Sequence, residues 1–389
     1  MISDPTIAQA LPDAWMRAID ESARTLLGPH DRVGDALATE VARLSELYTR
    51  DRGALRTQSA ALAARLRFFL PRDLPKIEGP LAELAWAGKL PAGPRWRVLD
   101  LGAGYGTTTL GISTYARRVG GIEGVAGIEG LDVIAAERDP RSLDAMRHLA
   151  RRAGQGDLAD VSVPIALDAR ELDVEHIDVR AFGGRFQLVV LGLALNELWI
   201  DRPDKLDRRA ALLARCAEIL TDDGAILVVE PALRESTREL MALRDRLVEL
   251  GKVHLFAPCT HTLPCPMLAR ERDWCHEDLP LALPESLRAI ARGAGLRFEG
   301  LSYAYLTLRR APGTIADGAY RIVGGPIETK GRTEWHGSGE GRLVRISRLD
   351  RHRTEGDPLE GARRGSIVEL EPGAPDAVRS DRTPIVRRR

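Results

Sequence analysis

The sequence predicts an α/β protein with a mostly parallel central sheet, because short apolar strands and amphipathic helices alternate over residues 95–300. The strands are nearly free of polar residues, as expected for strands that helices cover on both faces. Glycines follow the first strand directly, which is typical of a turn that approaches a ligand closely. The strands are predicted at 97–101, 131–137, 186–191 and 225–230, and the helices at 107–118, 141–152 and 207–220.

The flanking regions differ from this central domain. Residues 1–94 are predicted to be helical, since segments such as 35–48 and 59–69 carry apolar residues at intervals of three and four. Prolines then mark a boundary. Residues 301–371 are predicted to form a small β-rich domain, and residues 372–389 a disordered tail, because they contain many Pro, Asp and Arg residues and few apolar ones.

Composition excludes several classes of protein. The 389 residues carry 56 Lys and Arg against 56 Asp and Glu, so the chain is not a simple polycation that binds nucleic acid through net charge. We find no apolar run of the roughly 18 residues needed to span a membrane. The first residues also lack the pattern of a secretory signal. We therefore expect a monomeric protein of a reducing, cytoplasmic compartment that does not enter membranes.

The turn after the first strand reads Asp-Leu-Gly-Ala-Gly-Tyr-Gly over residues 100–106. A dinucleotide-binding fingerprint needs its third glycine at position 107, which is a threonine here. The motif instead resembles the first motif of class I, Rossmann-type, S-adenosylmethionine-dependent methyltransferases, in which the acid helps to position the methionine part of the cofactor. This resemblance implies cofactor-binding roles for Asp100, Gly102, Gly104 and Gly106. The alternative is a glycine turn in an unrelated α/β protein.

Two further acids are candidates for cofactor binding. Glu137 ends the second strand, where a carboxylate can accept hydrogen bonds from both ribose hydroxyls. Asp139 is interpreted as the cap of the following helix. Asp168 occupies a place where class I methyltransferases carry an acid that contacts the adenine amino group. The alternative for Glu137 is a solvated side chain at a strand end.

The end of the 186–191 strand should face the transferred methyl group. Methyltransferases that act on amino groups often carry Asp/Asn-Pro-Pro-Tyr/Phe there, but this chain has Asn196-Glu197-Leu198-Trp199 without prolines. Asn196 and Glu197 are therefore candidates either for orienting a substrate, with Glu197 as a hypothetical general base, or for capping a helix. Methyl transfer needs mainly alignment of the nucleophile with an already activated methyl group, so a weak motif does not exclude an enzyme.

Three of the four cysteines fall in one segment with the spacing C-x5-C-x9-C, at Cys259, Cys265 and Cys275. In a reducing compartment, clustered thiols indicate a metal site before they indicate disulfides. Zinc is one option, although zinc ribbons carry closer cysteine pairs. A Cys-Pro step and loose spacing favour an iron–sulfur cluster. Cys216, in an apolar helix, is interpreted as a core residue.

A nucleophilic role for Cys259 is a further alternative. Pro258-Cys259 superficially matches the nucleophile of cytosine C5-methyltransferases, but it lies well past the 225–230 strand.

Together, the glycine motif, Leu195–Leu198, Val229–Pro231 and the Ala-Pro-Cys…Cys-Pro…Asp-Trp-Cys-His run resemble one family. It is the methyltransferase-like family of mitochondrial small-ribosomal-subunit assembly proteins and their bacterial relatives. The similarity extends from about Ala60 to about Arg353. It implies a class I fold that binds S-adenosylmethionine, a four-cysteine 4Fe–4S site and a role on the small ribosomal subunit, here in the cytoplasm of a bacterium.

This chain departs from the family at the fourth ligand, because no cysteine follows Cys275. The family's fourth cysteine lies late in the sequence, where this chain has His336. Since imidazole can replace a thiolate on iron or zinc, His336 is the candidate fourth ligand.

Two functions follow from the resemblance. The first is a methyltransferase that acts on ribosomal RNA or a ribosomal protein in ribosome biogenesis and translation. The second is a non-catalytic iron–sulfur assembly factor that binds small-subunit RNA. From residue 301 onward the chain carries 17 Lys and Arg and 12 Asp and Glu, which gives RNA binding only modest support.

Overall fold

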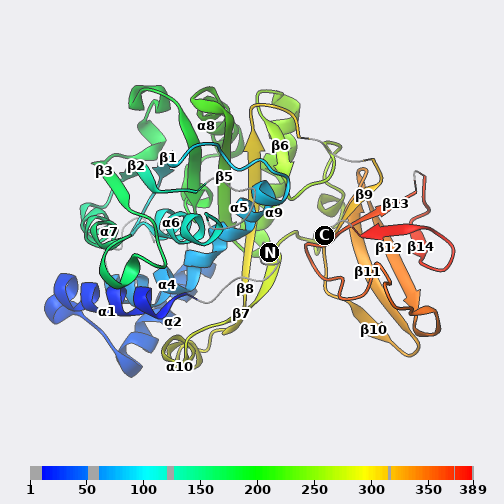
Figure 1. The fold of residues 1–389 in the computed structure, drawn as a ribbon, viewed down its shortest axis with the longest axis horizontal. Coiled ribbons are helices and arrows are strands. Elements are labelled where there is room, and N and C mark those ends of the chain that lie inside the picture. The colour runs from blue at the N-terminus through cyan, green and yellow to red at the C-terminus, as the bar shows by residue number, and fades with distance from the viewer. Residues whose placement is uncertain (1–10, 51–60, 121–126, 314–316, 372, 388–389) are drawn as a thin grey trace.

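In the part of the chain that the structure describes, the strands form two β-sheets, of which the larger is covered by helices on both faces and the smaller forms a separate layer near the C-terminus (Figure 1). The computed structural model describes residues 11–50, 61–120, 127–313, 317–371 and 373–387. Residues 1–10 and 51–60 of the predicted helical region, which include the first two residues of the predicted 59–69 helix, and residues 372, 388 and 389 of the predicted tail lie outside these ranges. Within the described ranges, no helix is both long and apolar enough to cross a bilayer.

The central sheet has the strand order β3-β2-β1-β4-β5-β8-β6, with β7 paired to β8. The first five strands in this order are parallel, and β8 runs antiparallel to β5, β6 and β7. The strands are β1 (Arg95–Leu101), β2 (Gly130–Glu137), β3 (Ile165–Glu171), β4 (Phe186–Gly192), β5 (Leu220–Pro231), β6 (His254–Ala257), β7 (Glu277–Ala282) and β8 (Glu299–Arg309). The strand order reverses between β1 and β4, and such a switch point is where open α/β sheets bind ligands.

The predicted strands and helices of this domain are confirmed to within a few residues at each end. The helices are α6 (Thr107–Val119), α7 (Pro140–Arg152), α8 (Lys205–Glu218), α9 (Arg234–Leu250) and α10 (Glu285–Gly293). Asp139 caps α7, because its side chain accepts a hydrogen bond from the backbone N–H of Arg141 at 3.2 Å. Cys216 is buried in α8, and this burial raises the pKa of its thiol to about 12.

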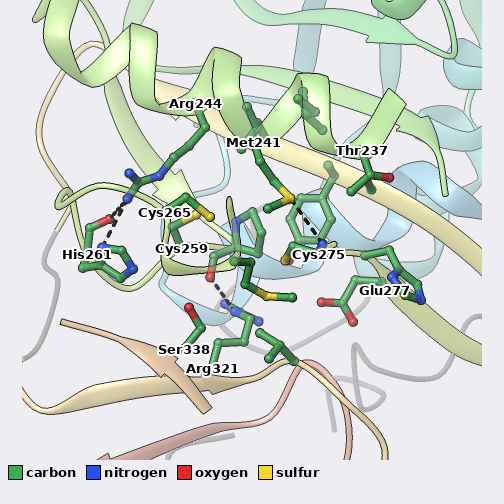
Figure 2. Close-up of a pocket in the computed structure, with 18 residues that line it drawn as sticks. Thr237, Met241, Arg244, Cys259, His261, Cys265, Cys275, Glu277, Arg321 and Ser338 are labelled. Carbon is green, nitrogen blue, oxygen red and sulfur yellow. Dashed lines mark hydrogen bonds between the residues drawn. The ribbon is translucent and has the colours of Figure 1, made fainter. Parts of the chain in front are cut away.

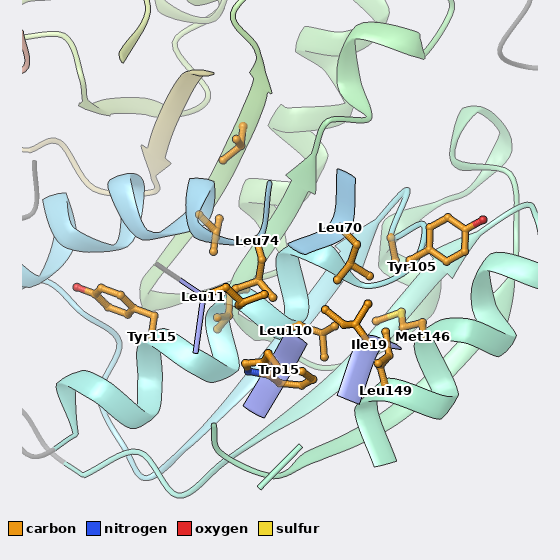
Figure 3. Packing of buried hydrophobic residues seen from close by; sticks show 14 of the residues in the cluster. Leu11, Trp15, Ile19, Leu70, Leu74, Tyr105, Leu110, Tyr115, Met146 and Leu149 are labelled. Carbon is orange, nitrogen blue, oxygen red and sulfur yellow. The ribbon is translucent and has the colours of Figure 1, made fainter. Parts of the chain in front are cut away.

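The N-terminal helices form a layer on the central domain. They are α1 (Asp13–Leu27), α2 (Gly34–Arg50), α3 (Leu62–Ala64), a π-helical turn (Arg65–Phe69), α4 (Leu70–Asp73) and α5 (Glu78–Trp86). Trp15 and Ile19 of α1 pack beside Leu110, Met146 and Leu149, which belong to α6 and α7 (Figure 3). This region therefore shares its core with the central domain instead of forming a core of its own.

The predicted boundary at residue 301 is wrong. Residues 299–309 form β8, which enters the central sheet between β5 and β6, with Leu306 opposite Val228. The strand is buried along almost its whole length, as an inner strand must be. A local apolar pattern identifies a strand but not the sheet to which it belongs, and β8 follows a long segment that separates it from β5.

The C-terminal sheet has the order β14-β12-β11-β9-β13-β15, with β10 paired to β11. Its strands are β9 (Ala319–Ile322), β10 (Ile327–Thr329), β11 (Arg332–Gly339), β12 (Arg342–Leu349), β13 (Ile367–Leu370), β14 (Ala377–Arg379) and β15 (Ile385–Arg387). The disordered tail predicted at 372–389 is therefore wrong for β14 and β15. Few apolar residues suffice there, because β12 and β13 supply the backbone partners and Val378 is buried in the domain core.

Candidate functional site

A cavity of about 640 Å³ lies over the carboxyl ends of β1, β2 and β4. The glycine turn, the end of β2 and the turn after β4 line it on the sheet side. Residues of α2, the π-helical turn, α4 and the segment after it line the opposite side, which we call the N-terminal wall. This wall consists of Ser45, Tyr48, Thr49, Arg65, Phe69, Leu70, Arg72, Asp73 and Lys76.

The three glycines of the turn have different tasks. All have positive φ, and a Cβ on Gly102 would lie 2.6 Å from Ala194 Cβ, while one on Gly106 would lie 2.7 Å from Met146 Cγ. A Cβ on Gly104 would meet no described protein atom within 4 Å. Gly102 and Gly106 therefore allow close packing of the turn, whereas Gly104 faces open space at the cavity.

Asp100 lies behind the turn and does not line the cavity. Its Oδ2 accepts a hydrogen bond from the Thr109 hydroxyl at 2.6 Å, and its buried Oδ1 has no partner in the described structure. Burial raises the pKa of Asp100 to about 7. Asp100 was predicted to help position the cofactor. In the structure it instead anchors the first turn of α6 beneath the glycine turn.

Glu137 lines the cavity at the end of β2. Its Oε2 accepts a hydrogen bond from Gly104 N at 3.0 Å, and its Oε1 accepts one from Asp139 N at 2.9 Å. The carboxylate therefore joins the glycine turn to the loop after β2 at the edge of the cavity.

Asp168 does not reach the cavity. It is exposed on β3, pairs with Arg170 at 2.7 Å and lies opposite Ile134, three residues before β3 ends. The residues that line the cavity at this end are Leu172, Asp173, Val174 and Glu175, which follow the strand. No strand was predicted at β3, because this edge strand is only partly buried and has no continuous apolar run.

Asn196 joins the ends of β4 and β5. Its backbone N–H donates to Glu230 Oε1 at 3.2 Å, and its side-chain amide donates to Oε2 of the same buried carboxylate. Burial raises the pKa of Glu230 to about 7. Arg209 of α8 donates to the carbonyl oxygens of Asn196 at 2.8 Å and Leu198 at 3.0 Å, which fixes the turn between the two strands.

Glu197, the neighbour of Asn196, lines the cavity directly. Leu193 and Trp199 flank this turn with φ of 60° and 52°, a conformation that non-glycine residues adopt at an energetic cost. Sequence reasoning found Asn196 and Glu197 but assigned no role to Arg209, which holds their turn in place.

The N-terminal wall was absent from the predicted site, since a helical pattern does not show what the helix covers. Lys76 is buried in this wall, and its Nζ lies 2.9 Å from Asp73 Oδ1. Burial lowers the pKa of Lys76, although the charge of Asp73 opposes this shift.

The three clustered cysteines line a second, smaller cavity, which holds about 50 Å³ (Figure 2). Cys259, Cys265 and Cys275 share its walls with apolar side chains and with Arg244 and Arg321. Burial raises the pKa of Cys265 to about 11 and raises that of Cys275 further. Within the described part of the chain, no group of three or more His, Cys, Asp or Glu side chains is already arranged around a metal position.

Helix α9 shapes the cysteine loop. Arg244 donates to the carbonyl oxygens of Leu263 and His261, and Asp245 accepts two hydrogen bonds from the backbone N–H of Cys265, at 3.1 and 3.0 Å. Arg238 donates to the carbonyl oxygens of Arg270 and Asp273. The loop is thus held by charged side chains in the conformation that brings the three thiols together.

His336 is not brought to this cavity. It is exposed on β11, two residues before Ser338, which does line the cavity. Two other histidines, His261 and His276, line it instead. The Nδ1 of His276 is buried without a hydrogen-bond partner among the described residues, and its ring stacks on Trp274 with centroids 4.0 Å apart.

The C-terminal domain meets the cysteine loop through a buried ion pair. Arg321 of β9 lies 3.1 Å from Glu83 of α5 and also donates to the carbonyl oxygen of Pro258, next to Cys259. Tyr305 of β8 donates to the same Glu83 carboxylate at 2.6 Å. Four segments distant in sequence therefore meet at this ion pair.

The strand order, the antiparallel β8 and the glycine turn at the switch point define a class I, Rossmann-type, S-adenosylmethionine-dependent methyltransferase fold. Residues 94–336, more than half of the chain, match the model of the family described as mitochondrial small ribosomal subunit Rsm22. The chain belongs to this family. No curated protein matches the chain.

Similar solved structures include several methyltransferases. Magnesium protoporphyrin IX methyltransferase from Synechocystis, with bound S-adenosylmethionine, is 13% identical over 70% of this chain and 97% of that chain, with a TM-score of 0.32. Precorrin-6y C5,15-methyltransferase from Geobacter metallireducens is 14% identical over 60% and 88% of the two chains, with a TM-score of 0.31. A glycopeptide N-methyltransferase complexed with S-adenosylhomocysteine is 25% identical over 39% and 47%, with a TM-score of 0.24.

Proposed function

We propose that the protein binds S-adenosylmethionine in the larger cavity and acts on the small ribosomal subunit. The observation that carries the cofactor assignment is the open space at Gly104, directly beside the Glu137 carboxylate at the switch point of the sheet. In this arrangement Glu137 would bind the ribose, the residues after β3 would contact the adenine, and the methionine part would extend toward Glu197. The family supports the ribosomal assignment.

Gly104→Asp is expected to abolish binding of S-adenosylhomocysteine, measured by isothermal titration, because the new carboxylate would occupy the ligand's space. Gly88→Asp is the matched control. Gly88 also has positive φ, and a Cβ there would meet no described protein atom within 4 Å, but it lies outside the cavity. The affinity of this control should equal that of the wild type. Retained binding in Gly104→Asp, or binding of NAD by the wild type, would contradict the cofactor assignment.

The proposed activity is methyl transfer to ribosomal RNA or a ribosomal protein. When bound, the cofactor supplies an activated methyl group, so the chain needs chiefly to align an acceptor with it. Glu197 is the acid that the structure offers beside the expected methyl position, and Asn196 holds it there through Glu230 and Arg209. We assign Glu197 the orientation of the acceptor and the uptake of its proton.

A comparison in cells separates this activity from an assembly role. Small subunits from cells that lack the protein should be missing a methyl group detectable by mass spectrometry, which the wild-type gene restores and Gly104→Asp does not. Unchanged RNA and protein methylation together with accumulated immature subunits would contradict the enzymatic proposal and favour the non-catalytic assembly factor.

The smaller cavity favours a second proposal, that the protein carries an iron–sulfur cluster at Cys259, Cys265 and Cys275. The three cysteines line one cavity whose other walls are mostly apolar and also include Arg244 and Arg321. The Nδ1 of His276, unpartnered within the described residues, adds a nitrogen donor at the same cavity. Zinc is the alternative metal for the same ligands.

The arginines of β12 and the segment after it give RNA binding little support, because most pair within their own domain. Arg342 pairs with Asp376 at 3.0 Å and Arg348 with Asp357 at 3.1 Å, while Arg353 pairs with Glu360. These charges are already compensated, so the RNA-binding surface of the assembly-factor alternative is not supported by them.

A further inference from the structure

The N-terminal wall brings to the cofactor cavity a cation that forms no ion pair with any described residue. This cation is Arg65, in the π-helical turn, and its buried Nε donates no hydrogen bond to a described residue. Arg65 lines the cavity directly. The other arginine of the wall, Arg72, is already engaged, because it lies over the Phe68 ring and 3.7 Å from Asp73.

The surroundings of Arg65 suit an anionic ligand group. The strongest electrostatic interactions of Arg65 are with the hydroxyls of Tyr48 and Tyr105, which both line the cavity, and burial raises the pKa of each to about 12. They therefore remain neutral hydrogen-bond donors at physiological pH. The Arg65 guanidinium has N–H donors without an acceptor among the described residues, and the hydroxyls beside it are neutral. A carboxylate or a phosphate could therefore accept hydrogen bonds from it.

Two acids of the cavity lining also interact electrostatically with Arg65. They are Glu137 at the end of β2 and Glu197 after β4. A ligand whose ribose binds Glu137 and whose adenine lies beyond β3 must place its remaining part elsewhere in the cavity that Arg65 lines. In S-adenosylmethionine that part is the methionine moiety, whose carboxylate is the only anionic group of the cofactor.

We propose that Arg65 binds the carboxylate of the cofactor's methionine moiety, an inference that rests on the proposed cofactor site. The ligand would thereby connect the sheet with the N-terminal helices, and Arg65 would select a cofactor that carries the carboxylate. A phosphate of bound RNA has the same chemistry, but Arg65 lines the same cavity as the glycine turn and Glu137, which favours the cofactor.

The test compares S-adenosylmethionine with its decarboxylated analogue by isothermal titration. The wild type should bind the complete cofactor at least about tenfold more tightly, because a charged hydrogen bond contributes at least that factor. Arg65→Met should weaken binding of the complete cofactor by about tenfold to a hundredfold and leave the analogue unchanged. Arg65→Lys should recover part of this preference, and Arg310→Met, which lies outside the cavity, should retain the wild-type preference.

Several outcomes would overturn the proposal. The proposal fails if the wild type binds both compounds with equal affinity. It also fails if Arg65→Met loses the same affinity for both compounds. That second result would indicate a structural role for Arg65, which a lower melting temperature of the variant would confirm. A loss of affinity for a small-subunit RNA oligonucleotide in Arg65→Met, with an unchanged cofactor preference, would assign Arg65 to a phosphate instead. Failure of the wild type to bind either compound would overturn the cofactor site itself, and this result is distinct from the others.

Discussion

Arg321→Met should lower the free energy of unfolding by about 3–5 kcal/mol, because it leaves the Glu83 carboxylate buried without its cation. Both side chains are less than one-tenth exposed, at 6% for Arg321 and 7% for Glu83. The substitution also removes the hydrogen bonds to the carbonyl oxygens of Gly365 and Pro258. Equilibrium unfolding in urea measures the effect.

The control for this prediction is Arg310→Met, whose ion pair with Asp222 is exposed and should contribute at most about 1 kcal/mol. Adding Glu83→Gln to Arg321→Met should recover part of the loss, since it removes the uncompensated charge. A loss no larger than that of the control would show that the ion pair does not hold the C-terminal domain in place.

If the proposed iron–sulfur cluster is present, Cys275→Ser should eliminate it, because Cys275 supplies one of the three thiols at the smaller cavity. Wild-type protein purified without oxygen should be brown and contain iron and acid-labile sulfide. Cys216→Ser is the matched control and should keep both, since Cys216 is buried in α8 away from this cavity. Metal binding couples to folding, so the Cys275 variant should also melt at a lower temperature.

The fourth ligand is tested by two histidine variants. Because His276 lines the cavity and His336 does not, we expect His276→Ala to lower the iron content and His336→Ala to leave it unchanged. The reverse result would restore His336 as the ligand. Stoichiometric zinc without sulfide would show that the bound metal is zinc and not an iron–sulfur cluster. Wild-type protein without any bound metal would contradict the proposed metal site.

The sequence was sufficient to predict β1, β2, β4 and β5, because each contains a short apolar run, but it did not predict β3, which is only partly buried. The sheet to which residues 299–309 belong could not be predicted, since only long-range pairing with β5 places this strand in the central sheet. The strands β14 and β15 were missed for a similar reason. These two segments form strands because they pair with β12 and β13, and their own composition does not indicate this pairing.

At the candidate sites, the sequence identified residues whose type is required by the backbone geometry. It did not identify residues that reach a site only through the packing of distant segments. The glycines of the turn could be recognised because their positive φ values and close contacts require glycine. The convergence of the cysteines followed from spacing alone. Arg65 and Lys76 could not be found, because a lone cation in a helical segment carries no local signal for the cavity it faces.

The ion pair between Glu83 and Arg321 also has a consequence for the order of biosynthesis. Glu83 is made 222 residues before Tyr305 and 238 residues before Arg321. At bacterial and eukaryotic elongation rates this separation corresponds to roughly ten to fifty seconds on the ribosome. During that interval neither Tyr305 nor Arg321 is available to the Glu83 carboxylate, and β8 is still missing from its place between β5 and β6. The last contact that neutralises this core can therefore form only when most of the polypeptide has left the peptidyl-transferase centre.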